Sequence, residues 1–337
     1  NSISKLYNKI SYDSRYLHNY LEDLLSLEAV GCKDWLTNKV DRCVGGKVAK
    51  QQCVGQLQLP LNNCGVMALD FESDNGIATS IGHSPISGLI DPVAGSRNSI
   101  AEALTNIIWA PIKDNIRGIS LSANWMWPCK NKGEDARLFK AVEAVSEFAI
   151  DLGINIPTGK DSLSMNQKYK DQEIKSPGTV IISATGHCEN INFVVEPVFK
   201  ENYGSIYYIN LSNDKFKLGG SSFSQIMGNV GLETPSIQNP EFFKKTFNVV
   251  QDLIKNELII AGHDIGSGGL ITSLLEMCFP SINISANIDL SALNEKDSVK
   301  LLFSENCGLI VQSKSEEIEK IFTQFSVEYY KIGEVIS

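Results

Sequence analysis

Apolar residues near the start of the chain recur every three or four positions, a spacing typical of an amphipathic helix. This spacing predicts a helix over residues 14–28, and a second short helical segment is expected over residues 32–44. The apolar positions of the first helix are Leu17, Leu21, Leu24 and Leu25. We therefore expect residues 1–45 to form a helical lead-in that precedes the main domains.

After Leu61 the pattern changes to short apolar runs of the β type. Runs over residues 65–69 and 77–81 are separated by a polar turn, which predicts a β-hairpin. The elements expected next are a helix over 96–109, a strand over 119–125, a helix over 135–152 ended by Gly153, and a strand over 179–185. Charged residues over 168–177 predict an exposed loop. Because adjacent strands precede the helices, the pattern favours an α+β first domain, residues 46–189.

Strands and helices alternate again beyond residue 189. The expected elements are a strand over 205–209, a helix after Gly219–Gly220, a helix over 240–256, and a strand–glycine–helix unit over 258–279. This alternation predicts an α/β second domain, residues 190–337. A length of 337 residues agrees with two domains of ~150 residues each.

Composition and charge narrow the classes of partner. The chain carries 30 basic and 39 acidic residues, a formal net charge of −9, so it has no broad positive field for nucleic acid or an anionic membrane. Apolar runs are far shorter than the ~20 residues of a membrane-spanning helix, and residues 1–13 show no secretory signal. Eight cysteines without a CxxC pair, mostly in apolar stretches, are typical of reduced thiols. We therefore expect a cytoplasmic protein that binds neither nucleic acid nor membranes.

The segment over residues 261–270 is the most informative for chemistry. It joins a buried-type strand to a helix, and its clustered glycines allow a ligand to approach the backbone closely. Free N–H groups at the start of the helix favour an anion, and Asp264 could hold a cation that bridges to that anion. A tight turn with an acidic N-cap explains the same residues equally well, so both interpretations remain open.

Other features indicate a ligand more weakly. Glu102 and Asn106 lie one turn apart on a helix and could share a hard cation, although a solvated polar face explains the same spacing. Gly219–Gly220 before a helix is a second candidate for a phosphate-binding helix start. Standard nucleotide motifs fail: residues 261–270 do not supply GxGxxG, and residues 153–162 miss the P-loop in spacing and in carrying Asp where Ser or Thr is required. The end of this second segment is expected to be a polar loop.

Several segments, taken in order along the chain, resemble one family of purine biosynthesis. They are residues 45–49, 60–64, 102–106, 121–126, 133–136 and 159–165, and His263–Asp264 with Gly268–Gly269. The family is the large-type phosphoribosylformylglycinamidine synthase, also called formylglycinamide ribonucleotide amidotransferase. The resemblance extends over nearly the whole chain and is to the second of the family's two synthetase halves.

This resemblance implies a fragment of a longer ATP-dependent ligase. Each synthetase half is similar to the aminoimidazole ribonucleotide synthetase superfamily, with an α+β first domain and an α/β second domain. The family enzyme uses ATP and glutamine-derived ammonia to convert formylglycinamide ribonucleotide into its amidine. The catalytic ATP site lies in the first half and the ammonia source in a glutaminase domain, so these would be the chain's partners. The second half carries no catalytic residues, and the isolated chain is expected to be inactive.

The second half is similar to the part that holds an auxiliary, structural nucleotide, ATP or ADP, with Mg²⁺. The positions that match nucleotide contacts are Lys33, Asn62 and Gly266, and those that match metal ligands are Asn63, Glu102, Asn106 and Asp264. At Glu102 and Asn106 the resemblance favours the metal over the solvated face. Asn63 stands where the family has an aspartate, and the loss of one negative charge should weaken Mg²⁺ binding.

Two other functions remain open. The chain could be a non-catalytic scaffold whose nucleotide site has decayed, which the presence of Asn63 favours. It could also be a free-standing small-molecule kinase or synthetase with a complete site of its own. For the isolated second half, apolar surface on the first domain that the other half would cover is expected to promote self-association.

Overall fold

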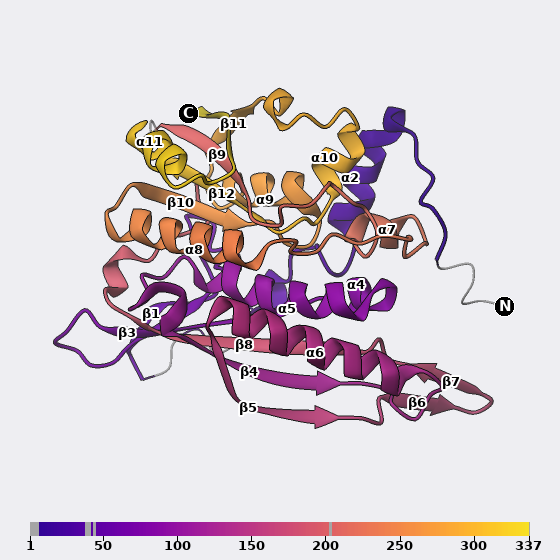
Figure 1. Ribbon diagram of the computed structural model, residues 1–337. Helices are drawn as coiled ribbons and strands as arrows, with labels where there is room; N and C mark the ends of the chain where they lie inside the picture. Colours follow the sequence, from indigo (N-terminus) through magenta and orange to yellow (C-terminus); the bar gives the residue numbers. More distant parts are fainter. Residues whose placement is uncertain (1–6, 38–41, 43–44, 202–203, 337) are drawn as a thin grey trace.

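The computed structural model describes residues 7–37, 42, 45–201 and 204–336 (Figure 1). The lead-in begins with a 3-10 turn, Ser14–Tyr16, and continues as helix α2, Leu17–Ser26, which confirms the first expected helix. Leu24 of α2 is fully buried and packs with Phe223 and Phe303 of the second domain. A short helix α3, Asp34–Thr37, lies within the second expected segment, of which residues 38–41 and 43–44 lie outside the described residues.

The first domain is built on a six-stranded sheet with the order β1-β2-β3-β8-β4-β5. Its strands are β1 Val48–Lys50, β2 Gly65–Ala68, β3 Gly76–His83, β4 Ile119–Met126, β5 Asn155–Ser162 and β8 Thr179–Cys188. The expected hairpin is the antiparallel pair β2–β3, and only the pair β4–β5 is parallel among the described strands of this sheet. Residues along β3 alternate strictly between buried and exposed, so one face of the sheet is covered and the other is open.

Three helices cover one face of this sheet: α4 Pro85–Ile90, α5 Pro92–Ile107 and α6 Glu134–Leu152. Asp91 caps α5 because its side chain accepts a hydrogen bond from the Val93 N–H, and a proline follows at the first helical position. Gly153 ends α6 in the left-handed region, as expected. A 3-10 turn, Asn115–Gly118, precedes β4.

Two expected loops prove to be β structure. Residues 168–177 contain most of an exposed hairpin, β6 Asn166–Tyr169 with β7 Gln172–Lys175, and residues 158–162 form the second half of edge strand β5. The prediction was wrong in both places because these strands are largely exposed on both faces. Their polar side chains therefore lack the alternating pattern that marks a half-buried strand, while backbone pairing still satisfies their N–H and C=O groups.

The second domain contains a five-stranded sheet with the order β10-β12-β9-β13-β11. Its strands are β9 Ser205–Asn210, β10 Ile259–Asp264, β11 Ser285–Ile288, β12 Gly308–Ser313 and β13 Tyr329–Ile336. Its helices are α7 Ser222–Ile226, α8 Pro240–Lys255, α9 Gly269–Cys278, α10 Ser298–Phe303 and α11 Glu317–Gln324, with 3-10 turns at Ile191–Phe193 and Ser291–Leu293. The expected mixture of helices and strands is confirmed, and all four strand pairs of the sheet are antiparallel. Side chains of α8 and α11 pack on one face of the sheet and those of α9 on the other.

The two domains share one continuous hydrophobic core. Helix α5 contacts both the first sheet and β10, and α6 contacts α8, so the helices form a layer between the sheets (Figure 1). Trp109, which is fully buried, lies against Gly262 of β10 so closely that an added Cβ would be 2.0 Å from its ring. Gln251 of α8 donates to the carbonyls of Ile108 and Ala110 and accepts from the Ile112 N–H. These contacts hold the end of α5 against the second domain.

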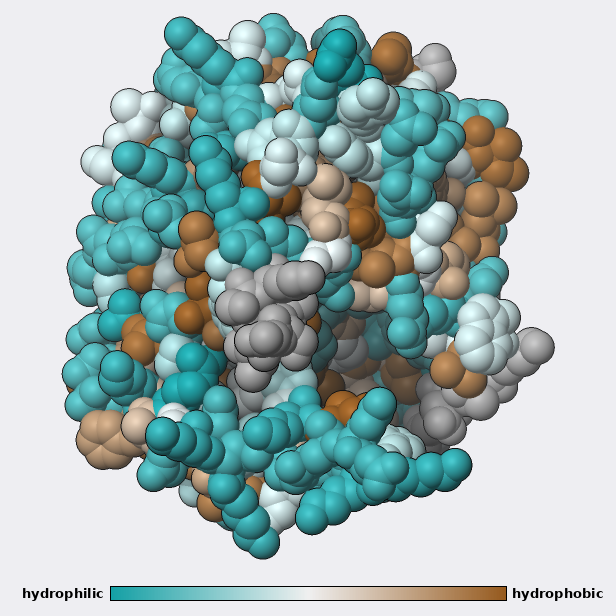
Figure 2. All heavy atoms as spheres, turned by 90° about the vertical axis from the view of Figure 1, so that its right-hand side faces the viewer, coloured by the Kyte–Doolittle hydropathy of each residue, from teal (hydrophilic) through white to brown (hydrophobic). Residues whose placement is uncertain are grey.

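The face shown in Figure 2 is mostly hydrophilic, with apolar residues gathered in and around a central hollow. Among the described residues, no helix has the length and apolar content that crossing a membrane requires.

Candidate functional site at the domain boundary

A cavity of about 250 Å³ lies where the two domains meet. The start of α4 and the middle of α5 form one side, and the β10–α9 loop with the start of α7 forms the other. Glu102, Gly266 and Glu305 are among its lining residues. The cavity therefore brings a residue of the first domain next to the glycine-rich segment of the second.

Glu102 is the acidic residue that the first domain contributes. Its Oε2 accepts a hydrogen bond of 2.6 Å from the His83 N–H at the end of β3. Burial raises the pKa of Glu102 to about 8; the hydrogen bond from the His83 N–H lowers this pKa, and the negative charges of Asp264 and Glu305 raise it. Glu102 thus lies close to two other carboxylates.

Asp264 ends β10 and is 4% exposed. Its Oδ1 lies 3.1 Å from His263 Nδ1, and His263 Nε2 lies 3.1 Å from Glu276 Oε2. Burial would lower the pKa of His263, but the hydrogen bonds to these two carboxylates raise it to about 10. The imidazolium therefore balances part of the negative charge on Asp264.

Asn63 lies beside the same pair. With its oxygen 2.9 Å from Trp109 Nε1, the amide accepts from the indole N–H and places its nitrogen 3.3 Å from Asp264 Oδ1. In this orientation the side chain presents a donor to Asp264. An aspartate here would instead place a second negative charge against Asp264, which a cation or a shared proton would have to balance. The Asn63 amide needs neither.

The glycine-rich segment binds an anion that the protein itself supplies. Gly268 N–H donates to Glu305 Oε1 at 2.7 Å, and Ser222 N–H, which follows Gly219–Gly220, donates to the same oxygen at 2.8 Å. Gly268 has φ +95°, a left-handed conformation suited to glycine. Both candidate phosphate-binding helix starts therefore converge, but on a carboxylate. Sequence reasoning missed Glu305, and its only local signal is an acidic residue between two apolar runs.

Of the predicted site residues, all of which the structure describes, Glu102 and Gly266 line the cavity, whereas Lys33, Asn62, Asn63, Asn106 and Asp264 do not. Asn106 donates to the Ile81 carbonyl at 3.2 Å, and Asn62 donates to the carbonyls of Gln51 and Cys53. Lys33 is exposed, and its ammonium group donates to the carbonyls of Glu28 and Gly31. Asn62 and Asn63 instead line a separate hollow of about 780 Å³ over the open face of the first sheet.

The four predicted metal ligands, Asn63, Glu102, Asn106 and Asp264, do not form a metal site made only of charged ligands. Within the described ranges, no group of three or more His, Cys, Asp or Glu residues has an arrangement that could hold a metal ion. Glu102 and Asp264 supply two carboxylates, and the other two predicted ligands are amides. Oxygen atoms of these types suit Mg²⁺, which usually keeps several waters and takes one or two carboxylates together with phosphate oxygens.

Comparison with known proteins places the chain in a family. The profile of the FGAR-AT PurM_N-like domain matches residues 32–187, and that of the AIR synthase related protein, C-terminal domain, matches residues 209–337. The probable phosphoribosylformylglycinamidine synthase of Caenorhabditis elegans is 41% identical over 93% of the chain, and the Homo sapiens phosphoribosylformylglycinamidine synthase is 39% identical over 92%. The chain belongs to the phosphoribosylformylglycinamidine synthase family. It spans about a quarter of the length of these relatives, 24% and 23%.

Solved structures agree on the fold. T. maritima PurL complexed with FGAR superposes with a TM-score of 0.69 at 15% identity, covering 96% of this chain and 50% of that one. A thiamine-monophosphate kinase from Stenotrophomonas maltophilia superposes with a TM-score of 0.52 at 10% identity, covering 81% of this chain and 86% of that one. The two-domain synthetase architecture expected from the sequence is confirmed.

Proposed function

We propose that the chain is the second synthetase half of a phosphoribosylformylglycinamidine synthase, and that its domain-boundary cavity holds an auxiliary nucleotide, ADP or ATP, with Mg²⁺. In the complete enzyme, ATP and glutamine-derived ammonia would convert formylglycinamide ribonucleotide into formylglycinamidine ribonucleotide. The first synthetase half and the glutaminase would supply the catalytic ATP site and the ammonia.

The observation that carries the nucleotide site is the meeting of two carboxylates from different domains. Glu102 and Asp264 lie close enough for the charge of Asp264 to raise the pKa of Glu102. A divalent cation between them would remove this repulsion, and Glu102 lines the cavity together with Gly266. Solved structures of T. maritima PurL complexed with ATP and with ADP share this fold, which is consistent with a nucleotide at such a site.

A decayed site is the second candidate, and Asn63 favours it. The Asn63 amide is held between Trp109 and Asp264, so no charge at this position calls for a metal. Glu305 already occupies the N–H groups of Gly268 and Ser222 that could otherwise bind phosphate. If the site has decayed, the cavity binds no nucleotide and only marks where the two domains pack together.

Titration calorimetry separates the two candidates. ADP added to the chain in the presence of Mg²⁺ should release or absorb heat at a stoichiometry near one, and chelation of Mg²⁺ should abolish the signal. Glu102→Gln should weaken binding by about tenfold or more, since it removes one of two charged ligands, whereas Glu143→Gln on the exposed side of α6 should not. Absence of heat in the presence of Mg²⁺ would establish the scaffold and refute the nucleotide site.

A further inference from the structure

The second domain contains a cavity that is separate from the proposed nucleotide site. It has a volume of about 560 Å³, within the ~300–1,000 Å³ range typical of small-molecule sites. The N-terminal segment around Lys9, the end of β9, the loop that follows β9 and the start of β13 surround it. It shares no lining residue with the domain-boundary cavity or with the hollow over the first sheet.

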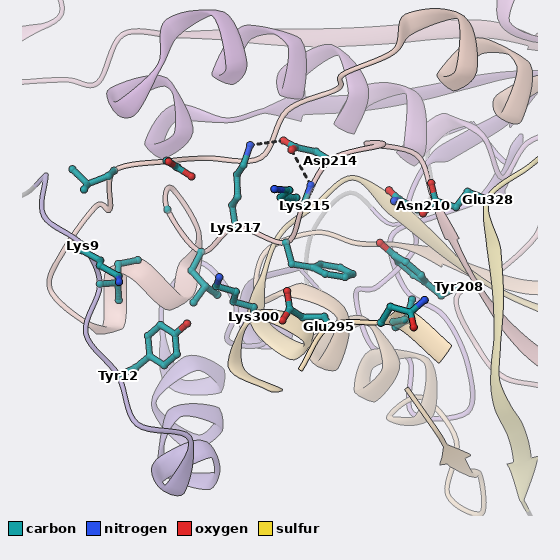
Figure 3. Close-up of a pocket in the computed structure, with 18 of the residues that line it drawn as sticks. Lys9, Tyr12, Tyr208, Asn210, Asp214, Lys215, Lys217, Glu295, Lys300 and Glu328 are labelled. Atoms are coloured by element: carbon teal, nitrogen blue, oxygen red, sulfur yellow. Dashed lines mark hydrogen bonds and ion pairs between the residues drawn. The ribbon is translucent and has the colours of Figure 1, made fainter. Parts of the chain in front are cut away.

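Four lysines and four carboxylates are among the residues that line this cavity, and three of the lysines gather on one side. Lys9, Lys217 and Lys300 come from three separate segments and lie toward the same side in Figure 3. Lys217 pairs with Asp214 at 2.7 Å, whereas Lys9 and Lys300 have no ion-pair partner in the part of the chain that the structure describes. Unpaired ammonium groups gathered in one cavity of an acidic protein favour an anionic ligand.

The other side is aromatic and accepts hydrogen bonds. Tyr208 is only 2% exposed, its hydroxyl points into the cavity in Figure 3, and no described residue hydrogen-bonds to that hydroxyl. Its ring stacks on Tyr330, with centroids 6.3 Å apart. Glu328 uses Oε1 for Asn210 and Tyr330, while its Oε2 has only a long 3.4 Å contact from Asn213. The Tyr208 hydroxyl faces the open space of the cavity, so it is available to donate to or accept from a ligand there.

We propose that this cavity binds a nucleoside monophosphate whose base carries an amino group. The phosphate would lie among Lys9, Lys217 and Lys300, and the base would lie against Tyr208, with its amino group donating to Glu328. A single phosphate fits better than a triphosphate because Asp214 already neutralises Lys217, and Glu295 is a further lining carboxylate. The separation of the cationic side from the acceptor side matches a ligand with an anionic end and a donor end.

The test is calorimetric titration of the full chain with AMP in EDTA, where a Mg²⁺-dependent site does not contribute. We expect AMP to bind at least tenfold more tightly than adenosine or inorganic phosphate, because each of these lacks one end of the ligand. IMP, which has a carbonyl in place of the amino group, should also bind several-fold more weakly. Equal affinity for AMP and inorganic phosphate, or absence of AMP binding, would overturn the proposal.

Single substitutions test whether AMP binds in this cavity. Lys300→Ala should weaken AMP binding by about tenfold, the size of one charge-assisted hydrogen bond, while Lys320→Ala on the exposed side of α11 should not. Tyr208→Phe removes only the hydroxyl and should weaken binding several-fold without lowering the melting temperature. Glu102→Gln should leave AMP binding unchanged, so this proposal and the Mg²⁺-nucleotide site can fail separately. AMP binding that survives Lys300→Ala, or that is lost with Glu102→Gln, would refute the assignment.

Discussion

At the scale of the residue, the identity of position 63 decides how much negative charge the domain boundary carries. Asn63 donates toward Asp264, whereas an aspartate would face it with a like charge. We therefore expect Asn63→Asp to lower the free energy of unfolding by about 1–3 kcal/mol in EDTA, and Mg²⁺ to restore much of the loss. Urea unfolding with and without Mg²⁺ measures both effects.

The matched control is Asn287→Asp, which adds the same charge at an exposed position of β11. Its free energy of unfolding should change little and should not respond to Mg²⁺. If Asn63→Asp behaves like this control, the Asn63 amide does not couple to Asp264 as the geometry indicates.

A second prediction at the scale of the residue concerns how Glu102 makes the free energy of unfolding depend on pH. Its pKa is about 8 in the folded chain and about 4.5 in the unfolded chain, so between these values the folded state holds a proton that the unfolded state has released. This stabilising contribution is complete below pH 4.5 and declines as the pH rises to 8, with a slope of at most ~1.4 kcal/mol per pH unit. In EDTA, Glu102→Gln should remove this part of the pH dependence, and Glu143→Gln should retain it. Denaturant unfolding at several pH values would contradict the prediction if both variants follow the parent chain.

At the scale of the element, helix α8 is joined to the end of α5 by one side chain. Gln251 is fully buried and satisfies two carbonyls and the Ile112 N–H of the first domain. Gln251→Ala would leave these groups buried without partners, so we expect a loss of about 2–4 kcal/mol in the free energy of unfolding. The exposed Gln324→Ala, at the end of α11, should cost far less. Equal effects in urea unfolding would show that this junction contributes little.

The elements that could be predicted are those whose signals are local. Helices α5, α6 and α8 have long apolar faces, and Gly153 and Asn239–Pro240 mark the ends of α6 and α8 as expected. The predicted start of α5, at residue 96, is four residues late because the prediction overlooks the Asp91–Pro92 cap. The antiparallel order of the second sheet depends on which strands meet, and alternation along the chain does not encode that. Strand β12 is buried at every position, so its apolar run has no period to distinguish a strand from a helix.

The residues of the candidate site also differ in how far the sequence alone points to them. Glu102 and Asp264 stand out in the sequence because one lies on a helix face and the other at the end of a strand before a glycine-rich turn. The residues alone leave a solvated face and a tight turn open, and only the resemblance favours a metal site. Glu305 could not, because its role depends on Ser222 and Gly268, which are 83 and 37 residues away. The spacing of Asn106 from Glu102 was equally suggestive, yet Asn106 donates to a carbonyl of the neighbouring strand β3.

At the scale of the whole molecule, the open face of the first sheet exposes large apolar side chains to water. Met67, Ile77 and Ile81 project from it with 45%, 43% and 58% of their surfaces exposed. The chain spans about a quarter of its relatives, and we propose that in the complete enzyme the first synthetase half covers this face. With the first half and the glutaminase absent, the chain alone should not turn over formylglycinamide ribonucleotide with ATP and ammonium, and a sensitive assay for the amidine product checks this.

The same face leads to a prediction about association. Contiguous exposed apolar side chains on a sheet promote pairing, so the chain should associate with itself as its concentration rises. Ile81→Lys places a charge on β3 of this face and should shift the chain toward the monomer. Ile282→Lys replaces an isoleucine that is 71% exposed on the second domain, and it should leave association unchanged. Sedimentation or light-scattering mass over a wide concentration range measures the effect. A strictly monomeric parent chain, or equal shifts in the two variants, would show that this face does not drive association.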